Sequence, residues 1–318
     1  MARLLHDYPV LAAALRGVEN AAATDAPVLI LGEPGTGRSS LARALHAASR
    51  RAVGPLVEVD PGAVPSALFE SEFFGYRAGA FTGAATAGEG RVARATGGTL
   101  VLDHVEELPL ASQPKLLRLL AERRYVPLGG KEAAADVRFI AIGPEDLTAR
   151  MARGAFRSDL YYRLEVVAFR LPPLRDREPD LSALLDDMLA DLGERFGRPG
   201  LALAPAARAW MRDHSWPGNL RQLRNVLERG LILSAARPAP AAERPADPLA
   251  DVIDPPPPPD FSLPAGSTPR PPRPLVEVEQ EKIREALAFT RGHQARAASL
   301  LGISRKALWE KRRRYGIP

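Results

Sequence analysis

A glycine-rich segment, GEPGTGRS at 32–39, has the residue types and the spacing of a phosphate-binding loop. It follows the apolar run VLIL at 28–31 and precedes a segment with helical spacing. Glycines let backbone N–H groups curl around phosphate oxygens, and the N-terminus of the following helix adds a favourable dipole. The segment fits the pattern G-x-x-x-x-G-K-[ST] except at Arg38, where the pattern has lysine. We therefore predict a nucleotide site here, with the hydroxyl of Ser39 on Mg²⁺. The residues predicted to hold the nucleotide are Gly32, Glu33, Pro34, Gly35, Thr36, Gly37, Arg38 and Ser39.

A second candidate for this chemistry is the stretch GGTLVLDHVEELP at 97–109. Its apolar part predicts a buried strand that ends in Asp103, whose carboxylate suits a Mg²⁺ ion beside a nucleotide. Such sites usually place a second carboxylate next, but this chain has His104. Imidazole is a base near neutral pH, yet it adds no negative charge beside the metal. We therefore expect Asp103 and Ser39 to bind Mg²⁺, and we take His104 as a candidate catalytic residue.

The segments around these residues alternate between strand-like and helix-like patterns. Strands are predicted at 28–31, 56–60, 99–103 and 136–142, and helices at 40–50 and 111–124. This alternation predicts an α/β fold with a mostly parallel sheet covered by helices. Beyond residue 173, helical patterns at 180–196, 202–214 and 219–235 predict an α-helical subdomain.

The chain divides at a proline-rich segment. Residues 236–274 contain 14 prolines and few large apolar residues, so we predict a semi-extended linker. The last segment, 275–318, has ten Lys and Arg residues and five acidic residues, and this surplus of five equals the formal net charge of the whole chain, +5. Such an asymmetry predicts a nucleic-acid-binding domain at the end of the chain.

Composition excludes several other classes of protein. The 318 residues include no cysteine, which excludes disulfides, thiol chemistry and cysteine-rich metal sites and agrees with a reducing cytoplasm. No apolar run approaches the roughly 20 residues that a membrane helix needs. The first residues, MARLLHDYPVLAAAL, lack the pattern of a signal peptide. We therefore expect a cytoplasmic protein with no membrane segment.

Three further segments resemble one protein family. GAFTGA at 79–84 is the signature of the AAA+ activators of sigma-54 RNA polymerase, the bacterial enhancer-binding proteins. GAFRSDLYYRLEVVAFRLPPLRDR at 154–177 resembles the arginine-finger region of that family, and WPGNLRQLRN at 216–225 resembles its sensor II segment. The resemblance covers about 1–235 and 275–318, and the end of the chain is similar to the family's Fis-type helix-turn-helix.

This resemblance implies a domain plan and a mode of action. The plan has an AAA+ α/β subdomain at 1–172, a helical lid at 173–235, a linker at 236–274 and a Fis-type helix-turn-helix at 275–318. Members of the family form homo-oligomeric rings, usually hexamers, which bind ATP between subunits and push the GAFTGA loop against the sigma-54 RNA polymerase holoenzyme. Because the AAA+ motifs begin by residue 28, we expect no sensory domain ahead of them.

The resemblance also assigns roles to individual residues. Arg157 and Arg163 match the two arginines that reach the γ-phosphate of a neighbouring subunit, and Arg221 matches the sensor II arginine. An arginine from a neighbour supplies positive charge to the phosphoryl oxygens and couples hydrolysis to assembly. The loop expected to contact sigma-54 consists of Gly79, Ala80, Phe81, Thr82, Gly83 and Ala84.

The end of the chain has the residues of two closely packed helices. Gly302 permits a tight turn, and Ser304 can cap a second helix at 305–314. We expect this helix to bind double-stranded DNA, with its first residues at base edges in the major groove and its later arginines on phosphates. Leu308 and Trp309 are expected in the core. The predicted DNA-binding residues are Arg305, Lys306, Lys311, Arg312, Arg313 and Arg314.

Four positions depart from the hydrolytic site of the family. Arg38 replaces the loop lysine and carries its charge on a longer, planar fork. His104 stands where the family has the glutamate that activates the attacking water, and Pro144 stands where it has the asparagine that senses the γ-phosphate. Asp60 replaces an asparagine, and its carboxylate could contact and orient His104. We therefore expect ATP binding with impaired hydrolysis.

The sequence alone leaves three functional hypotheses open. The first is a working or slow ATPase that activates transcription by sigma-54 polymerase. The second is a DNA-binding regulator that does not hydrolyse ATP, acting as a repressor or in mixed rings with an active paralogue. The third is a factor for ordinary promoters that has kept GAFTGA by descent. Phosphate release separates the first two, and a sigma-54 binding assay with Thr82→Ala as control tests the third.

Overall fold

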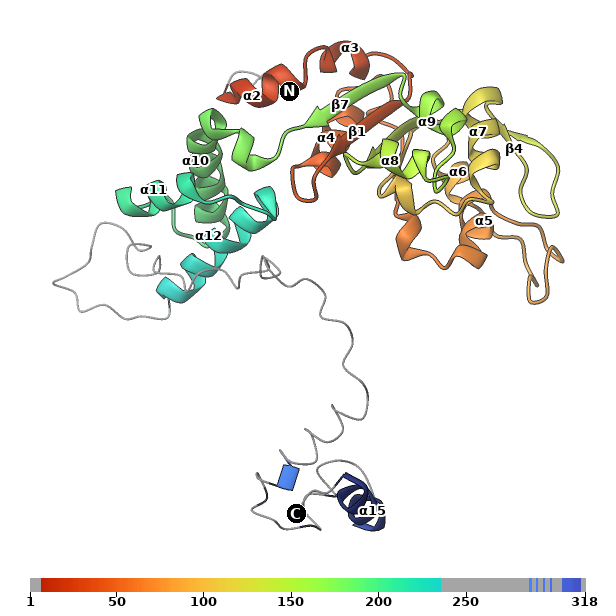
Figure 1. Ribbon diagram of the computed structural model, residues 1–318. Coiled ribbons are helices and arrows are strands. Elements are labelled where there is room, and N and C mark those ends of the chain that lie inside the picture. Colours follow the sequence, from red (N-terminus) through yellow and green to blue (C-terminus); the bar gives the residue numbers. More distant parts are fainter. Residues whose placement is uncertain are drawn as a thin grey trace. The chain divides into compact units, whose positions relative to one another are not determined.

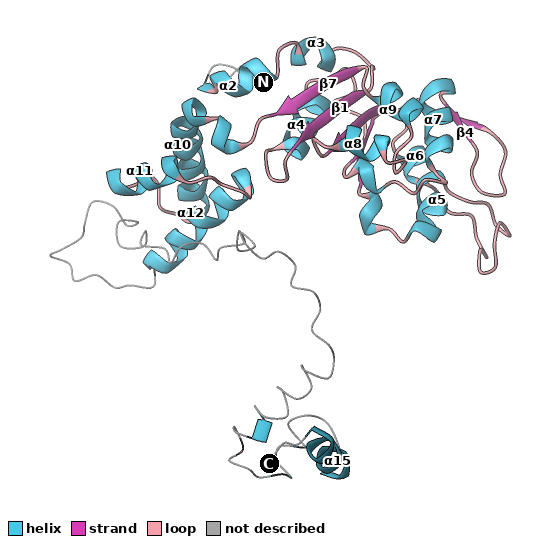
Figure 2. Cartoon of the chain, in the orientation of Figure 1, coloured by secondary structure: helices cyan, strands magenta, loops and turns pink. Residues whose placement is uncertain are grey.

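The computed structural model of the chain consists of two compact units, 1–254 and 255–318. It describes residues 7–235, 286–287, 290, 294, 298 and 305–315. The segment predicted as a linker lies outside these residues, as do Gly302 and Ser304 of the predicted turn. Figures 1 and 2 show the helices and strands of each unit.

A five-stranded parallel sheet is the centre of the first unit. Its strands are β1 (Val28–Gly32), β2 (Leu56–Val59), β3 (Thr99–Leu102), β6 (Arg138–Gly143) and β7 (Val167–Leu171). They lie in the order β2-β3-β6-β1-β7, with Leu31 paired with Gly143 and Leu102 paired with Ala141. Because the strands are parallel, the segments that follow them meet at one edge of the sheet. This edge brings the phosphate loop and Asp103 together.

Helices cover both faces of this sheet (Figure 2). They are α2 (Pro9–Ala14), α3 (Val18–Ala22), α4 (Arg38–Ala47), α5 (Ser66–Phe74), α6 (Arg91–Arg94), α7 (Gln113–Glu122), α8 (Leu147–Ala152) and α9 (Ser158–Leu164). The helical subdomain, α10 (Glu178–Arg195), α11 (Pro205–Asp213) and α12 (Asn219–Ala235), lies to one side of the sheet, next to α2 (Figure 1). Successive side chains of a strand point to opposite faces. Val28 and Ile30 of β1 therefore join a core with α2–α4 and α10–α12, whereas Leu29 and Leu31 join one with α5, α7 and α9.

Shorter elements complete the described part of this unit. The 3₁₀ turns are η1 (Pro61–Ala63), η2 (Val105–Glu107) and η3 (Leu174–Asp176), and β4 (Arg124–Tyr125) pairs with β5 (Ala133–Ala134) in an antiparallel hairpin. η2 directly follows Asp103 and its histidine neighbour, and η3 leads from the sheet into α10. Both turns therefore adjoin the edge that carries the phosphate loop.

A buried carboxylate ties the helical subdomain to the N-terminal helix. Asp180 of α10 accepts hydrogen bonds from the backbone N–H groups of Val10 at 2.9 Å and Leu11 at 3.1 Å. Arg177 donates to the same carboxylate at 3.0 Å. The first turn of any helix leaves N–H groups without an intrahelical partner. Asp180 supplies that partner for α2, so the two helices are held together.

The α/β fold predicted from the sequence is confirmed, with each predicted strand and helix of the first unit present. The helix predicted at 40–50 begins earlier, at Arg38, directly after the loop. The sequence pattern does not predict β7, because this strand is a partly exposed edge of the sheet and lacks a continuous apolar run. Among the described residues, no helix is both long and apolar enough to cross a membrane.

The second unit is described around α15 (Arg305–Tyr315). Leu308 is 1% exposed and packs with Ala286, Leu287 and Ala298, so its prediction as a core residue is confirmed. Trp309 is 53% exposed, and its prediction as a core residue is wrong. Adjacent residues of a helix point about 100° apart, since a turn takes 3.6 residues. Position 309 therefore lies beside the buried face rather than on it.

Candidate functional site

The phosphate loop runs from the end of β1 to the start of α4. Gly35 has a φ of 82°, a left-handed conformation that glycine adopts without strain, and a Cβ there would lie 2.4 Å from the carbonyl oxygen of Gly218. Thr36 is buried, and its Oγ1 donates to the carbonyl of Glu33 at 2.8 Å. The chain thus forms the tight, close-packed turn that a phosphate cradle needs.

The structure brings the two predicted Mg²⁺ ligands together. Oγ of Ser39, at the start of α4, donates to Oδ2 of Asp103 at 3.0 Å. The N–H of Asp103 donates to the carbonyl of Val59 at 2.9 Å, which fixes the carboxylate at the sheet edge. The described residues hold no group of three or more His, Cys, Asp or Glu side chains that could bind a metal ion alone. A hydroxyl and a carboxylate fit Mg²⁺, which completes its octahedron with waters and substrate phosphates.

Arg38 is buried and bonded to the protein itself. It is 7% exposed, and its Nη1 donates to the carbonyl of Gly32 at 2.8 Å and to that of Gly143 at 2.6 Å. Burial lowers the pKa of Arg38, and the negative charges of Asp103 and Glu106 oppose that effect. The guanidinium therefore links the start of the loop to the end of β6, with two of its hydrogen bonds committed to backbone carbonyls.

The contact predicted between Asp60 and His104 is confirmed. Nδ1 of His104 lies 3.2 Å from Oδ2 of Asp60, whose other oxygen accepts the N–H of Gly62 at 3.0 Å. His104 has a φ of 54°, which is uncommon for a residue other than glycine. Its N–H donates to Oδ1 of Asp103 at 3.0 Å. The imidazole is thus oriented by one carboxylate while its backbone is held by the other.

The end of β6 and the turn after β3 supply two more groups at this edge. Pro144 follows β6 and has no side-chain donor to offer a phosphate. Glu106 of η2 is not among the residues predicted from the sequence. Its Oε2 is buried and lacks a hydrogen-bond partner among the described residues. In the sequence, Glu106 is recognisable only as an acidic residue two positions after His104. The burial of its oxygen depends on tertiary structure.

The sequence also does not predict the junction between the loop and the helical subdomain. Arg175 of η3 pairs with Glu33 through two hydrogen bonds of 2.9 and 2.6 Å, and these bonds hold the pKa of the Glu33 carboxyl below its usual value. Asn219 is fully buried. Its Nδ2 donates to Oε2 of Glu33 and to the carbonyl of Pro34, each at 3.1 Å, and its Oδ1 accepts the N–H of Leu174 at 2.7 Å. Two elements of the subdomain therefore hold the start of the loop.

The next residues of α12 also lie against the loop. The N–H of Leu220 donates to the carbonyl of Gly35 at 3.0 Å. A Cβ on Gly35 would lie 3.3 Å from Cβ of Arg221, whose charge lowers the pKa of Arg38 alongside the larger effect of burial. The predicted sensor II arginine thus stands beside the phosphate loop.

The two predicted arginine-finger residues are exposed, with Arg157 directly before α9 and Arg163 within it. Arg157 donates to the carboxylate of Asp159 at 3.0 and 2.7 Å. Arg163 donates from Nη2 to the carbonyl of Leu120 at 3.2 Å. Among the hydrogen bonds of the described residues, these two side chains make none to the phosphate loop of their own chain.

The GAFTGA segment is the tip of a loop whose base is fixed. Tyr76 and Gly88 exchange two backbone hydrogen bonds of 2.9 Å, and the rings of Tyr76 and Phe81 are 5.0 Å apart. Phe81 is 42% exposed, and Thr82 is exposed. Ala84 is buried, so it packs within the loop instead of presenting a contact surface. The remaining predicted contact residues, Gly79, Ala80 and Gly83, are exposed or half-buried.

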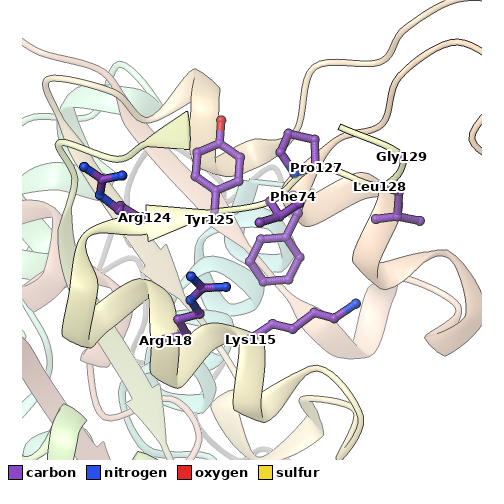
Figure 3. Close-up of a pocket in the computed structure, with 9 residues that line it drawn as sticks. Phe74, Lys115, Arg118, Arg124, Tyr125, Pro127, Leu128 and Gly129 are labelled. Carbon is purple, nitrogen blue, oxygen red and sulfur yellow. The ribbon is translucent and has the colours of Figure 1, made fainter. Parts of the chain in front are cut away.

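A surface pocket of about 400 Å³ adjoins the base of this loop (Figure 3). Phe74 at the end of α5 and Tyr125 of β4 line it, together with basic side chains of α7 and β4. Leu128 also lines it and donates its N–H to the carbonyl of Gly75 at 2.9 Å. The pocket therefore lies between the end of α5, α7 and the segment 124–129.

One basic residue of α15, Arg313, lies beside the exposed Trp309. Cζ of Arg313 is 5.6 Å from the ring centroid of Trp309, within the range of a cation–π contact. Arg313 is exposed, and Lys311 and Arg312 are half-buried. The side chains of the other predicted DNA-binding residues, Arg305, Lys306 and Arg314, lie outside the described part of the structure.

Comparison with known protein families assigns three segments. The Sigma-54 interaction domain matches residues 4–170. The AAA+ ATPase lid domain matches 175–246, and the family described as Bacterial regulatory protein, Fis family, matches 274–315. Together the three matches span the sheet, the helical subdomain and the basic end of the chain.

Individual relatives are similar along most of this chain. Alginate biosynthesis transcriptional regulatory protein AlgB of Pseudomonas aeruginosa is 39% identical over 97% of this chain and 66% of its own length. Regulatory protein AtoC of Escherichia coli is 40% identical over 99% of this chain and 68% of its own. A crystal structure of NtrX from Brucella abortus in complex with ATP has a TM-score of 0.67 and 32% identity, over 96% of this chain and 68% of that one. This chain thus spans about two thirds of the length of these relatives.

Proposed function

Because the chain belongs to the family of AAA+ activators of sigma-54 RNA polymerase, we propose that it is a transcriptional regulator that binds ATP, Mg²⁺ and DNA and acts in the cytoplasm. The single observation that carries the nucleotide part is the contact of 3.0 Å between Ser39 and Asp103, beside the glycine-rich phosphate loop. The structure of NtrX in complex with ATP supports it. The Fis-family match and the basic helix α15 support binding to double-stranded enhancer DNA.

Each part of the site has a role in this proposal. Backbone N–H groups of the loop and the N-terminus of α4 hold the phosphates, and Ser39 and Asp103 hold Mg²⁺. Arg221 stands beside the loop to bind phosphate oxygens. Arg157 and Arg163 reach the γ-phosphate of a neighbouring subunit. Their exposure supports this role, as do their described hydrogen bonds, which go to Asp159, Leu120 and Ala121 and not to the phosphate loop. The active form is then a homo-oligomeric ring, which we propose to be a hexamer.

The GAFTGA loop is the proposed contact with the sigma-54 holoenzyme. Phe81 and Thr82 are exposed at its tip, and the paired base at Tyr76 and Gly88 gives the tip a fixed support. An exposed aromatic ring on a supported loop can bind a partner and transmit a push from the body of the protein.

Hydrolysis is proposed to be slow. A loop lysine is a mobile point charge that neutralises phosphate oxygens, whereas Arg38 is buried and bonded to the carbonyls of Gly32 and Gly143. His104, at the position that carries the family's water-activating glutamate, is directed at Asp60. Pro144 has no donor for the γ-phosphate. These changes weaken charge stabilisation in the transition state more than they weaken binding.

The test measures ATP binding and steady-state phosphate release on one purified sample, with His104→Glu as the comparison variant. We expect clear ATP binding, turnover well below that of a family member with the loop lysine and the glutamate, and faster turnover in His104→Glu. Wild-type turnover equal to that of such a member overturns slow hydrolysis. Failure to bind ATP overturns the nucleotide part of the proposal.

The committed hydrogen bonds of Arg38 favour a second candidate function, a DNA-binding regulator that holds ATP without cleaving it. ATP is then an assembly ligand, and the protein represses transcription or joins mixed rings with an active paralogue. Bound ATP recovered intact after prolonged incubation with Mg²⁺ supports this candidate over the slow ATPase.

A further inference from the structure

Glu106 in η2 is a half-buried acidic residue, and the roles above do not explain one of its carboxylate oxygens. Its Oε2 is buried and has no hydrogen-bond partner among the described residues. Leaving a buried carboxylate oxygen unpaired is unfavourable, so native structures normally pair such atoms with protein or water. This oxygen is therefore ready to accept a hydrogen bond from a group that the protein itself does not supply.

Glu106 belongs to the edge where the phosphate loop and β6 meet. Its neighbour Val105 packs against the end of β6, since a Cβ on Gly143 would lie 3.2 Å from Cγ1 of Val105. Burial raises the pKa of the Glu106 carboxyl, and a hydrogen bond from its own backbone, together with the charges of Arg150 and Arg38, opposes that rise. Glu106 follows Asp103 by three residues, and the Asp103 carboxylate accepts a hydrogen bond of 3.0 Å from Ser39 of the phosphate loop.

The adjacent acid, Glu107, has a different environment. Its side chain is 52% exposed and lies 3.7 Å from Arg150. Its Cγ would be 3.5 Å from a Cβ on Gly62, so it faces η1 and solvent. Two consecutive carboxylates of one turn thus separate into an exposed ion-pair partner and an inward acceptor.

His104 differs from Glu106 in having a hydrogen-bond partner and a more exposed side chain. Its Nδ1 is directed at Asp60, at 3.2 Å, and its side chain is 44% exposed. We propose that Glu106 is the catalytic carboxylate of the site, and that its buried oxygen accepts a proton from the water that attacks the γ-phosphoryl group of ATP. This inference rests on the proposed function, because it requires ATP at the phosphate loop.

The step balances without any further reactant. The water oxygen forms a bond to the γ-phosphorus, and the bond from that phosphorus to the β–γ bridging oxygen breaks. The bridging oxygen leaves with the electron pair, which gives ADP and inorganic phosphate. The proton lost by the water passes to the Glu106 carboxylate and from there to solvent, and nothing is oxidised or reduced.

The first experiment compares Glu106→Gln with Glu107→Gln in the full chain, by steady-state phosphate release. Both substitutions keep the shape of the side chain and remove one negative charge. Since a positioned general base contributes about 10²–10⁴-fold to rate, we expect Glu106→Gln to lower turnover by about 100-fold or more. Glu107→Gln is expected to leave it unchanged. Equal turnover in Glu106→Gln and wild type overturns the inference, as does wild-type protein that binds ATP and releases no phosphate.

The second experiment measures binding of ADP with and without aluminium fluoride, which mimics the phosphoryl group in transfer. We expect aluminium fluoride to tighten ADP binding in wild type and Glu107→Gln but not in Glu106→Gln, while all three bind ADP alone equally. A purely structural role for Glu106 would weaken ADP binding as well and would overturn the inference. If wild type binds neither ATP nor ADP, the proposed function itself fails, and this result is distinct from loss of the tightening in one variant.

Discussion

Arg38 is a residue at which we expect fold stability and nucleotide binding to change in opposite directions on substitution. Its buried guanidinium bonds two carbonyls that belong to different strands. We expect Arg38→Lys to lower the free energy of unfolding by about 1–3 kcal/mol, because a compact ammonium cannot satisfy both carbonyls at once. We also expect tighter ATP binding, since the lysine charge becomes free to meet phosphate oxygens. Urea unfolding and titration with ATP measure the two effects.

The matched control for that substitution is Arg43→Lys, one turn further along α4. Arg43 is exposed and bonds Glu58 at 2.6 and 2.9 Å, so its replacement should change stability by no more than about 0.5 kcal/mol. ATP binding should not change. Weaker ATP binding in Arg38→Lys would mean that the guanidinium itself binds the nucleotide, contrary to the expectation.

Single residues differ in how far the sequence predicts them. Ser39 and Asp103 are predictable because a loop and a strand end place them by local pattern alone, and their contact follows from the parallel sheet. The Asp60–His104 contact follows from the same reasoning about strand ends. The buried oxygen of Glu106 is not predictable, because burial and lack of a partner depend on residues distant in sequence.

At the scale of elements, we expect the hydrogen bonds that join η3 and α12 to the phosphate loop to affect both stability and ATP binding. Asn219 bonds the loop at Glu33 and Pro34 and bonds η3 at Leu174. We expect Asn219→Gly to lower the free energy of unfolding by about 1–3 kcal/mol, because buried groups lose their partners. It should also weaken ATP binding, since the loop loses its support. Thermal unfolding and ATP titration measure these changes.

Glycine is the informative replacement because Asn219 has a φ of 51°, and glycine keeps that conformation without strain. Asn219→Ala adds strain to the lost bonds and should be less stable than Asn219→Gly. Asn225→Ala, at an exposed position of the same helix, is the control and should bind ATP normally. Normal ATP binding in Asn219→Gly would show that the junction does not support the loop.

The helices and strands that can be predicted from the sequence are those with a strong local pattern of apolar residues. Continuous apolar runs identify β1, β3 and β6, which are buried along their whole length. The hairpin of β4 and β5 has two residues in each strand. Strands this short show no alternation of apolar and polar residues from which they could be predicted. The junction also escapes prediction, because hydrogen bonds between η3, α12 and the loop join segments about 140 to 190 residues apart.

At the scale of the whole molecule, the proposed active site needs two copies of the chain. The loop, Ser39 and Asp103 gather at one sheet edge, whereas Arg157 lies on the surface at the start of α9 and pairs with Asp159. In a ring with head-to-tail contacts, each subunit presents a different surface to each neighbour. Such a site takes its phosphate loop from one subunit and its arginine from the next. Two inactive variants, one altered in the loop and one lacking the arginine, can therefore form an intact site together.

We expect Arg157→Ala to bind ATP normally and to release no phosphate, and Ser39→Ala to fail because it lacks a Mg²⁺ ligand. An equal mixture of the two should regain about a quarter of wild-type turnover. In a randomly mixed ring, about half of the subunits have an intact loop, and about half of their neighbours supply an intact arginine. Arg153→Ala, at another exposed arginine just before α9, is the control and should keep full turnover. Phosphate release measured across mixing ratios should peak near equal amounts. A mixture that stays inactive at every ratio would show that Arg157 acts within its own chain, and the site would then not be shared between subunits.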